Sequence, residues 1–150
     1  MAENFKALDP EWERKIRASF KRQGFMNYLH AEIVQAVPGS LTIEVPFRPE
    51  LTQQHGFFHA GVVGAIADTA GGYAGFSLFP PDSTVLTVEF KINLLSPAKG
   101  DRLQALAKVI KPGRTLTVCD LKVHVMNGTR TVLCASGQQT LICLAGKPDQ

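Results

Sequence analysis

The sequence is poor in the features that mark disulfide scaffolds and membrane proteins. It has only three cysteines, Cys119, Cys134 and Cys143, and no two of them form a CxxC pair. An odd number of isolated thiols argues against a disulfide framework and favours a reducing compartment. No apolar run is long enough to span a bilayer, and the charged N-terminal residues lack the apolar stretch of a signal peptide. The sequence therefore predicts a cytoplasmic protein without a membrane partner.

A strong excess of one charge is also missing. The chain has 16 basic and 13 acidic residues, which gives a formal net charge of +3. The basic residues are scattered apart from a short group near the N-terminus, so nothing predicts binding to nucleic acid. Hydrophobic residues make up 45% of the 150 positions, which is ordinary for a globular protein. This length and composition predict a single domain over residues 1–150.

Two motifs of hydrolytic chemistry are absent. The sequence has no GxSxG elbow, which argues against a serine hydrolase of the α/β type. His55 and His59 have no third ligand at a suitable spacing, so we expect no metal site.

The hydrophobic pattern predicts a helix, two strands, a long buried helix and four strands. The first helix is expected at about 10–23, with Asp9 as its N-cap and Gly24 as its stop. Strands are predicted over 25–37 and 40–47, and a loop over 48–58. A long helix over 59–79 and strands over 84–95, 102–111, 114–126 and 129–144 follow.

This order predicts an α+β domain in which an antiparallel sheet wraps around one long central helix, with a separate N-terminal helix. One face of the sheet would cover the central helix. Its open edges and its outer face would then favour association with a second copy of the chain.

The central helix carries an unusual stripe of small residues. Gly61, Gly64, Asp68, Gly71 and Gly75 follow one another at intervals of three, four, three and four residues, which places them on one side of a helix. The glycines are equally explained by tight packing on the sheet, with the acid as a surface residue. A carboxylate within a long apolar helix is nevertheless costly unless it is hydrogen-bonded or functional, which favours a site.

Polar residues gather just before this helix. Gln53, His55 and His59 precede a helix start whose backbone N–H groups, near Ala60 and Gly61, are free to hold a developing oxyanion. The two histidines are equally explained as capping or turn residues.

Residues 53–68, QQHGFFHAGVVGAIAD, resemble the PaaI-type hotdog thioesterases. The pattern of that family is Asn/Gln-x-x-Gly-x-x-His-Gly-Gly, with an Asp nine residues after the His. Residues 88–98 and 113–116 resemble the strand and the hairpin that follow in the family, so the resemblance extends over about 41–144. It implies a hotdog fold and the hydrolysis of an acyl-CoA to a carboxylic acid and CoA.

The resemblance also implies roles for individual residues. Asp68 matches the catalytic acid, which acts as general base or as nucleophile. Gln53 matches a residue that orients water or the thioester carbonyl, and His59 helps to shape the oxyanion end. Ala60 occupies the position of the family's first glycine and keeps its N–H. Thr87 matches an assisting hydroxyl. Strand alternation is expected to place Thr87, Glu89, Lys91 and Asn93 on one face. For the last three, an ordinary solvated strand face is an equally good explanation.

The implied substrate contains CoA, so no separate cofactor is expected. Arg114, beside Gly113 in a turn, is the first candidate for the CoA phosphates, and Lys111 and Lys99 follow it. Ordinary turn charges explain the two lysines at least as well. The resemblance further implies a homo-oligomer, a dimer or a dimer of dimers, in which Asp68 of one chain faces Gln53 and His59 of the other.

Two other functions compete with the thioesterase. A hotdog dehydratase of hydroxyacyl thioesters would carry a differently placed hydratase motif, which this sequence lacks. A non-catalytic acyl-CoA-binding module would not need both Asp68 and Gln53. The acyl group itself is left open by the sequence.

Overall fold

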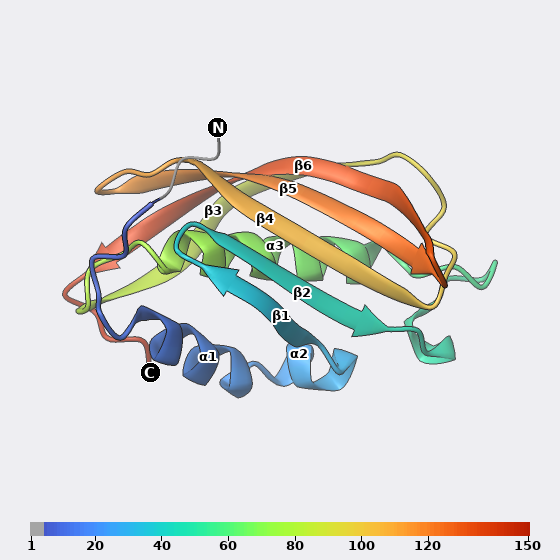
Figure 1. The fold of residues 1–150 in the computed structure, drawn as a ribbon, viewed down its shortest axis with the longest axis horizontal. Coiled ribbons are helices and arrows are strands. Elements are labelled where there is room, and N and C mark those ends of the chain that lie inside the picture. Colours follow the sequence, from blue (N-terminus) through green and yellow to red (C-terminus); the bar gives the residue numbers. More distant parts are fainter. Residues whose placement is uncertain (1–4) are drawn as a thin grey trace.

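The computed structural model describes residues 5–150 and consists of one curved sheet folded over a central helix (Figure 1). The helices are α1 (Trp12–Arg22), α2 (Gly24–Leu29) and α3 (Ala60–Phe76), with a short 3₁₀ turn, η1 (Pro49–Leu51). The strands are β1 (Glu32–Val37), β2 (Ser40–Pro46), β3 (Ser83–Leu94), β4 (Arg102–Lys111), β5 (Leu116–Asn127) and β6 (Arg130–Ala145). They follow the order β1-β2-β4-β5-β6-β3, and every neighbouring pair is antiparallel.

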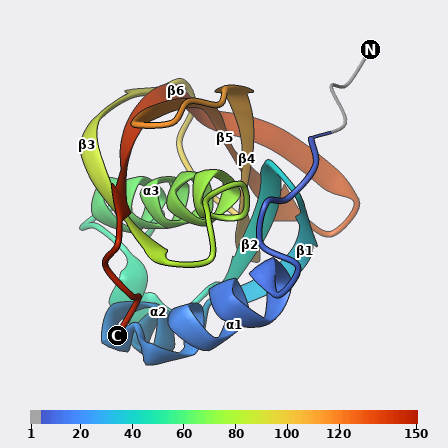
Figure 2. The same cartoon turned by 90° about the vertical axis from the view of Figure 1, so that its left-hand side faces the viewer.

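Helix α3 lies in the concave face of the sheet, and α1 and α2 lie below it (Figure 2). The core fills the space between α3 and the strands, and Ile66, Phe76, Leu103 and Leu121 are almost completely buried there. Because α3 is covered by the sheet and by α1, it is apolar on nearly all sides. The predicted architecture, a sheet wrapped around one long helix with an N-terminal helix before it, is confirmed.

One predicted strand segment is wrong. Residues 25–29 were expected to extend a strand but belong to α2, where Met26 and Leu29 are buried one helical turn apart. Gly24, expected to stop the first helix, is instead the first residue of α2, and α1 ends at Arg22 with Gln23 as its C-cap. His30 ends α2 with a left-handed φ of 54°, and the strand starts only at Glu32.

The boundaries of the two long helices also differ from the prediction. Helix α1 has Glu11 and not Asp9 at its N-cap, although Asp9 Oδ1 accepts a 2.8 Å hydrogen bond from the Glu11 N–H. Asp9 instead belongs to the turn before the helix, where its main-chain oxygen accepts from the Trp12 N–H at 3.2 Å. Helix α3 ends at Phe76, before the expected 79, because the chain turns over Ser77–Phe79 ahead of two prolines.

Strand β4 has the predicted bounds. The bounds of β2, β3, β5 and β6 differ from the prediction by only one or two residues at an end. Within residues 5–150, no helix is long and apolar enough to cross a membrane.

Candidate active site

Asp68 lies midway along α3 in a closed triangle of hydrogen bonds. Its Oδ1 accepts from the Thr87 hydroxyl at 2.7 Å and from the Gln139 amide nitrogen. Gln139 Nε2 also lies 3.0 Å from the main-chain oxygen of Asp68 and 3.0 Å from Thr87 Oγ1, so its two hydrogens are shared among three acceptors. Among the described residues, none donates a hydrogen bond to Oδ2. One carboxylate oxygen is therefore held, and the other is free for a ligand or water.

A bulge in β3 turns Thr87 toward Asp68. Thr87 is opposite Leu141 of β6, whereas Glu89 is already opposite Thr140, so Val88 is an extra residue in the ladder. An extra residue reverses the faces that the side chains after it occupy. Thr87 therefore points to α3, and Glu89, which accepts a hydrogen bond from Thr140, lies on the outer face. The prediction of one shared face is wrong for the first of its four residues, Thr87, Glu89, Lys91 and Asn93.

The glycine stripe brings α3 close to β6. A Cβ added to Gly71 would lie 1.8 Å from Gln139 Oε1, and one added to Gly75 would lie 2.3 Å from Leu141 Cδ1. These glycines leave the space that the β6 side chains occupy, which is the packing explanation of the stripe. Asp68 lies on the same side of the helix and is thereby placed against Gln139.

His59 caps the start of α3 with its side chain. Its Nδ1 accepts a 2.8 Å hydrogen bond from the Gly61 N–H, so a neutral His59 carries its proton on Nε2. The Gly61 N–H, expected to face an oxyanion, is thus already engaged within the chain. The Ala60 N–H has no acceptor among the described residues. Ala60 also lies outside the positive-φ region, which only His30 adopts among the described non-glycine residues, so an alanine fits the place of the family's glycine.

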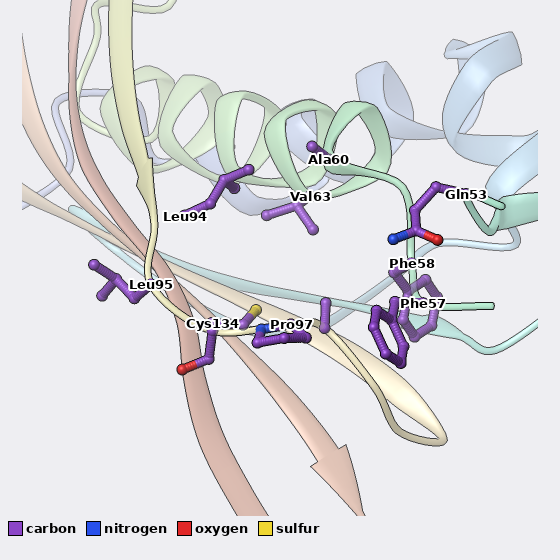
Figure 3. A pocket seen from close by; sticks show the side chains of 11 residues that line it. Gln53, Phe57, Phe58, Ala60, Val63, Leu94, Leu95, Pro97 and Cys134 are labelled. Atoms are coloured by element: carbon purple, nitrogen blue, oxygen red, sulfur yellow. The ribbon is translucent and has the colours of Figure 1, made fainter. Parts of the chain in front are cut away.

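Gln53 closes the turn ahead of this helix. Its N–H donates to the Phe57 oxygen at 2.9 Å, and its main-chain oxygen accepts from the Gly56 N–H at 3.0 Å. The side-chain oxygen accepts from the His55 N–H. This arrangement turns the amide nitrogen of Gln53 toward the adjoining pocket (Figure 3).

That pocket, which we call the helix-start pocket, has a volume of about 420 Å³. Its walls are mostly apolar, and the Gln53 amide and the first residue of α3 add polar groups, a combination typical of small-molecule sites. The lining residues are Gln53, Phe57, Phe58, Ala60, Val63, Leu94, Leu95, Ser96, Pro97, Ala98 and Cys134.

A second cavity, of about 330 Å³, adjoins Asp68 and is more polar. We call it the carboxylate cavity. At its far side the Tyr73 hydroxyl contacts Ser19 Oγ and accepts from Gln23 Nε2, both at 3.0 Å. Burial raises the pKa of Tyr73, so this phenol is neutral at ordinary pH. The lining residues are Ser19, Gln23, Asp68, Thr69, Gly72, Tyr73, Val85, Leu86, Thr87 and Asp149.

The two halves of the predicted site do not meet within one chain. Ala60 and Gln53 line the helix-start pocket, whereas Asp68 and Thr87 line the carboxylate cavity. Asp68 follows Ala60 by eight residues on α3, a rise of about 12 Å along the helix axis. One thioester carbonyl cannot contact both groups of the same chain.

The residues predicted to contact CoA are also divided between the two ends of α3. Lys111, Gly113 and Arg114 belong to the β4–β5 turn, which lies over the C-terminal end of the helix (Figure 1). Gly113 and Arg114 line a cavity of about 370 Å³ there with residues that follow α3. Lys99 adjoins Ala98, which lines the helix-start pocket at the opposite end.

The cysteines are unsuited to nucleophilic chemistry. Burial raises the pKa of Cys119 to about 12 and that of Cys134 to about 11, and it also raises the pKa of Cys143. These thiols stay protonated at neutral pH, and the thiolate is the reactive form. Among residues 5–150, no group of three or more His, Cys, Asp or Glu side chains is placed to hold a metal ion.

Gln139 is the functional candidate that sequence reasoning missed. It is followed and preceded by polar residues in β6, and its neighbour Gln138 is also a glutamine. Only the register of β6 decides that Gln139 faces α3, where it is 1% exposed, while Gln138 faces outward. A faint signal was available in the alternation of β6, because Gln139 falls in phase with the apolar residues Leu141 and Cys143.

Comparison with known proteins places this geometry in a family. The model of the thioesterase superfamily matches residues 55–132. A thioesterase family protein from Silicibacter pomeroyi has a similar structure, with a TM-score of 0.89 and 44% identity over 90% of this chain and 99% of the other. The PaaI protein of E. coli, from the phenylacetic acid degradation operon, has the same fold, with a TM-score of 0.81 and 21% identity over 94% and 99% of the two chains.

A relative with a defined reaction is the 1,4-dihydroxy-2-naphthoyl-CoA hydrolase of Listeria monocytogenes. It is 25% identical to this chain over 113 residues, which cover 75% of this chain and 90% of the relative. Together these likenesses confirm the predicted hotdog fold and its resemblance to the PaaI-type proteins.

Proposed function

The chain belongs to the thioesterase superfamily, and from this premise we propose that it hydrolyses an acyl-CoA thioester with Asp68 as the catalytic carboxylate. The family supports thioester hydrolysis in general, and the Listeria relative, a CoA hydrolase, supports CoA as the thiol. The observation that carries the role of Asp68 is its asymmetric binding. Oδ1 is held by Thr87 and Gln139, and Oδ2, which accepts no hydrogen bond from residues 5–150, lies next to a polar cavity with room for water.

In the proposed reaction, a water oxygen attacks the thioester carbonyl carbon and Asp68 Oδ2 accepts the water proton. The tetrahedral intermediate then expels the thiolate of CoA, and the carbonyl reforms as the carboxylic acid. In the alternative route, Oδ2 attacks the carbon directly, the thiolate leaves, and water hydrolyses the resulting anhydride. Both routes balance with one water consumed, and both use the same free oxygen.

The start of α3 would stabilise the negative oxygen in either route. The Ala60 N–H, which has no acceptor among residues 5–150, lies at the positive end of the helix dipole. His59 adds an N–H at Nε2, because its Nδ1 is occupied by Gly61. We assign Gln53, whose amide nitrogen faces the helix-start pocket, to the orientation of the thioester or of water.

Two copies of the chain are needed to combine these groups. The separation of about 12 Å along α3 requires the helix start of one chain to face Asp68 of another. Strand β3 is suited to this contact because it is the last strand of the sheet and lies beside Asp68. Its side chains Leu86, Val88 and Phe90 are 57%, 57% and 44% exposed, so this edge strand presents apolar surface at the bulge and on both sides of it. We therefore propose a homodimer, or a dimer of dimers, with two shared sites per dimer.

The phosphates of CoA would be bound by cations at the rim of the shared site. Arg114 is the first candidate, because guanidinium binds phosphate oxygens in a bidentate manner. In a dimer with opposed helices, the β4–β5 turn of one chain, with Lys111 and Gly113, would approach the helix start and Lys99 of the other. CoA enters only as part of the substrate.

The test of the proposed function is replacement of Asp68 by Asn. We expect Asp68→Asn to lower kcat by about 100- to 10,000-fold, because removal of a general base costs that range. Asp120→Asn is the matched control, since Asp120 lies on the outer face of β5 beside Lys122. Thiol release from a panel of acyl-CoAs measures the rates, and thermal unfolding checks that the variants are folded. Unchanged turnover in Asp68→Asn would reject the assignment.

The same assay separates hydrolysis from the two competing functions. A non-catalytic binding module would bind acyl-CoA without releasing thiol. A dehydratase would change the acyl group and leave the thioester intact. The sequence also lacks the hydratase motif of a hotdog dehydratase, which favours hydrolysis over dehydration.

A further inference from the structure

Gln139 is buried at a cost to folding. Its side chain is 1% exposed, and its Oε1 has no hydrogen-bond partner in the described part of the chain. A buried carbonyl oxygen that loses its water without gaining a donor destabilises the folded state. An apolar side chain of similar length would fill the same space without this penalty. Packing alone therefore does not explain why an amide side chain is present at position 139.

The two amide hydrogens of Gln139 are shared among acceptors on Asp68 and Thr87. Its Nε2 donates to both the main-chain oxygen and Oδ1 of Asp68, so it holds the backbone and the carboxylate together. Nε2 also donates to Thr87 Oγ1. Because the hydroxyl oxygen accepts that bond, its own proton is directed to Asp68 Oδ1.

We propose that Gln139 is a positioning residue that fixes the rotamer of Asp68, so that Oδ2 faces the carboxylate cavity. This inference rests on the proposed function of Asp68 and adds a residue outside the reacting groups. Gln139 would act through Asp68 and Thr87 without touching the substrate. Gly71 makes this arrangement possible, because a Cβ at that position would lie 1.8 Å from Gln139 Oε1 and displace it.

The direct test is Gln139→Met, which keeps the length of the side chain and removes its polar atoms. We expect kcat for acyl-CoA hydrolysis to fall by about 10- to 100-fold, the effect of losing one charge-assisted hydrogen bond. KM should change by less than about twofold, because a positioning residue does not contact the substrate. The unfolding temperature should change little, because the loss of the Nε2 hydrogen bonds to Asp68 is offset by removal of the buried Oε1 that has no partner among the described residues. A residue with only a structural role would lower the unfolding temperature and leave the kcat of the folded fraction unchanged.

A second pair of variants tests the same point through shape. Gly71→Ala and Gly75→Ala both crowd α3 against β6, but only the first collides with Gln139, while the second meets Leu141. At equal folded fraction, we expect Gly71→Ala to lower kcat by about 10-fold relative to Gly75→Ala. Equal kcat in the two variants, or full kcat in Gln139→Met, would overturn the positioning role. In either case a strong loss in Asp68→Asn would leave the proposed function standing, whereas full activity in Asp68→Asn would reject that function itself.

Discussion

Complementation between two inactive chains is the sharpest test of a site shared between copies. Asp68→Asn damages the carboxylate half of the site, and Gln53→Ala damages the helix-start half. In a dimer that contains one chain of each kind, one site collects both defects. The other site combines the intact Asp68 of one chain with the intact Gln53 of its partner.

The size of the effect follows from this geometry. Random mixing makes about half of the dimers mixed, and each mixed dimer has one intact site of two, so the mixture should reach about 25% of wild-type activity. The parents should be far below this level. Loss of the general base costs about 100- to 10,000-fold, and loss of a polar group that orients the reacting atoms costs about 10- to 100-fold.

The assay is thiol release after co-expression of the two variants with different affinity tags and purification through both tags. The doubly tagged protein should then approach about 50% of wild-type activity, because every dimer is mixed. The control is the double variant Asp68→Asn/Gln53→Ala mixed with itself under the same conditions. Activity of the mixture that equals the mean of the two parents would refute the shared site and place the whole reaction in one chain.

The other predictions concern phosphate binding, assembly and the thiols. Arg114→Ala should raise KM for acyl-CoA about 10-fold with kcat little changed, and the effect should vanish for a truncated thioester without the nucleotide. Phe90→Asp, on the exposed apolar edge of β3, should shift the protein to monomers by light scattering and abolish activity; an active monomer would contradict the model. Because burial raises the pKa of Cys119 to about 12 and that of Cys134 to about 11, both thiols stay protonated well above pH 8. A thiol reagent should therefore modify the native protein slowly at pH 8 and rapidly only after unfolding. The rate at which the reagent inactivates the enzyme should not increase between pH 7 and pH 9.

Most of the fold could be predicted because the strands alternate regularly. In β5, every second side chain is buried against α3, and in β4 the alternation starts and stops with the strand itself. The failure at residues 25–29 has a physical reason. A segment of six residues shows too few turns for a helical period to be distinguished from a strand, and the burial of Met26 and Leu29 depends on contacts that only the folded chain provides.

The position of Asp68 and of the helix start could be predicted for a different reason. Both lie on one long helix, where spacing along the chain converts directly into direction and distance. The stripe of Gly71 and Gly75 identified the face that packs on the sheet, although the side chain it accommodates, Gln139, stayed hidden. The sequence predicts which residues share a face of one helix. Which side chain of a neighbouring strand contacts that face depends on the register of the strand.

Register is also why the polar partners of Asp68 were harder to foresee than the acid itself. A single extra residue at Val88 reverses the faces of β3, so Thr87 reaches α3 while Glu89 points away. Bulges of this kind are common next to active sites, where they redirect a side chain. Here the bulge has a further consequence. The bulge lies where Asp68 meets the edge strand. Thr87, which donates a hydrogen bond to the carboxylate, therefore belongs to the same strand as the edge that would contact a second chain. The shared site that we propose would place the helix start of a second chain at this edge, beside Oδ2 of Asp68.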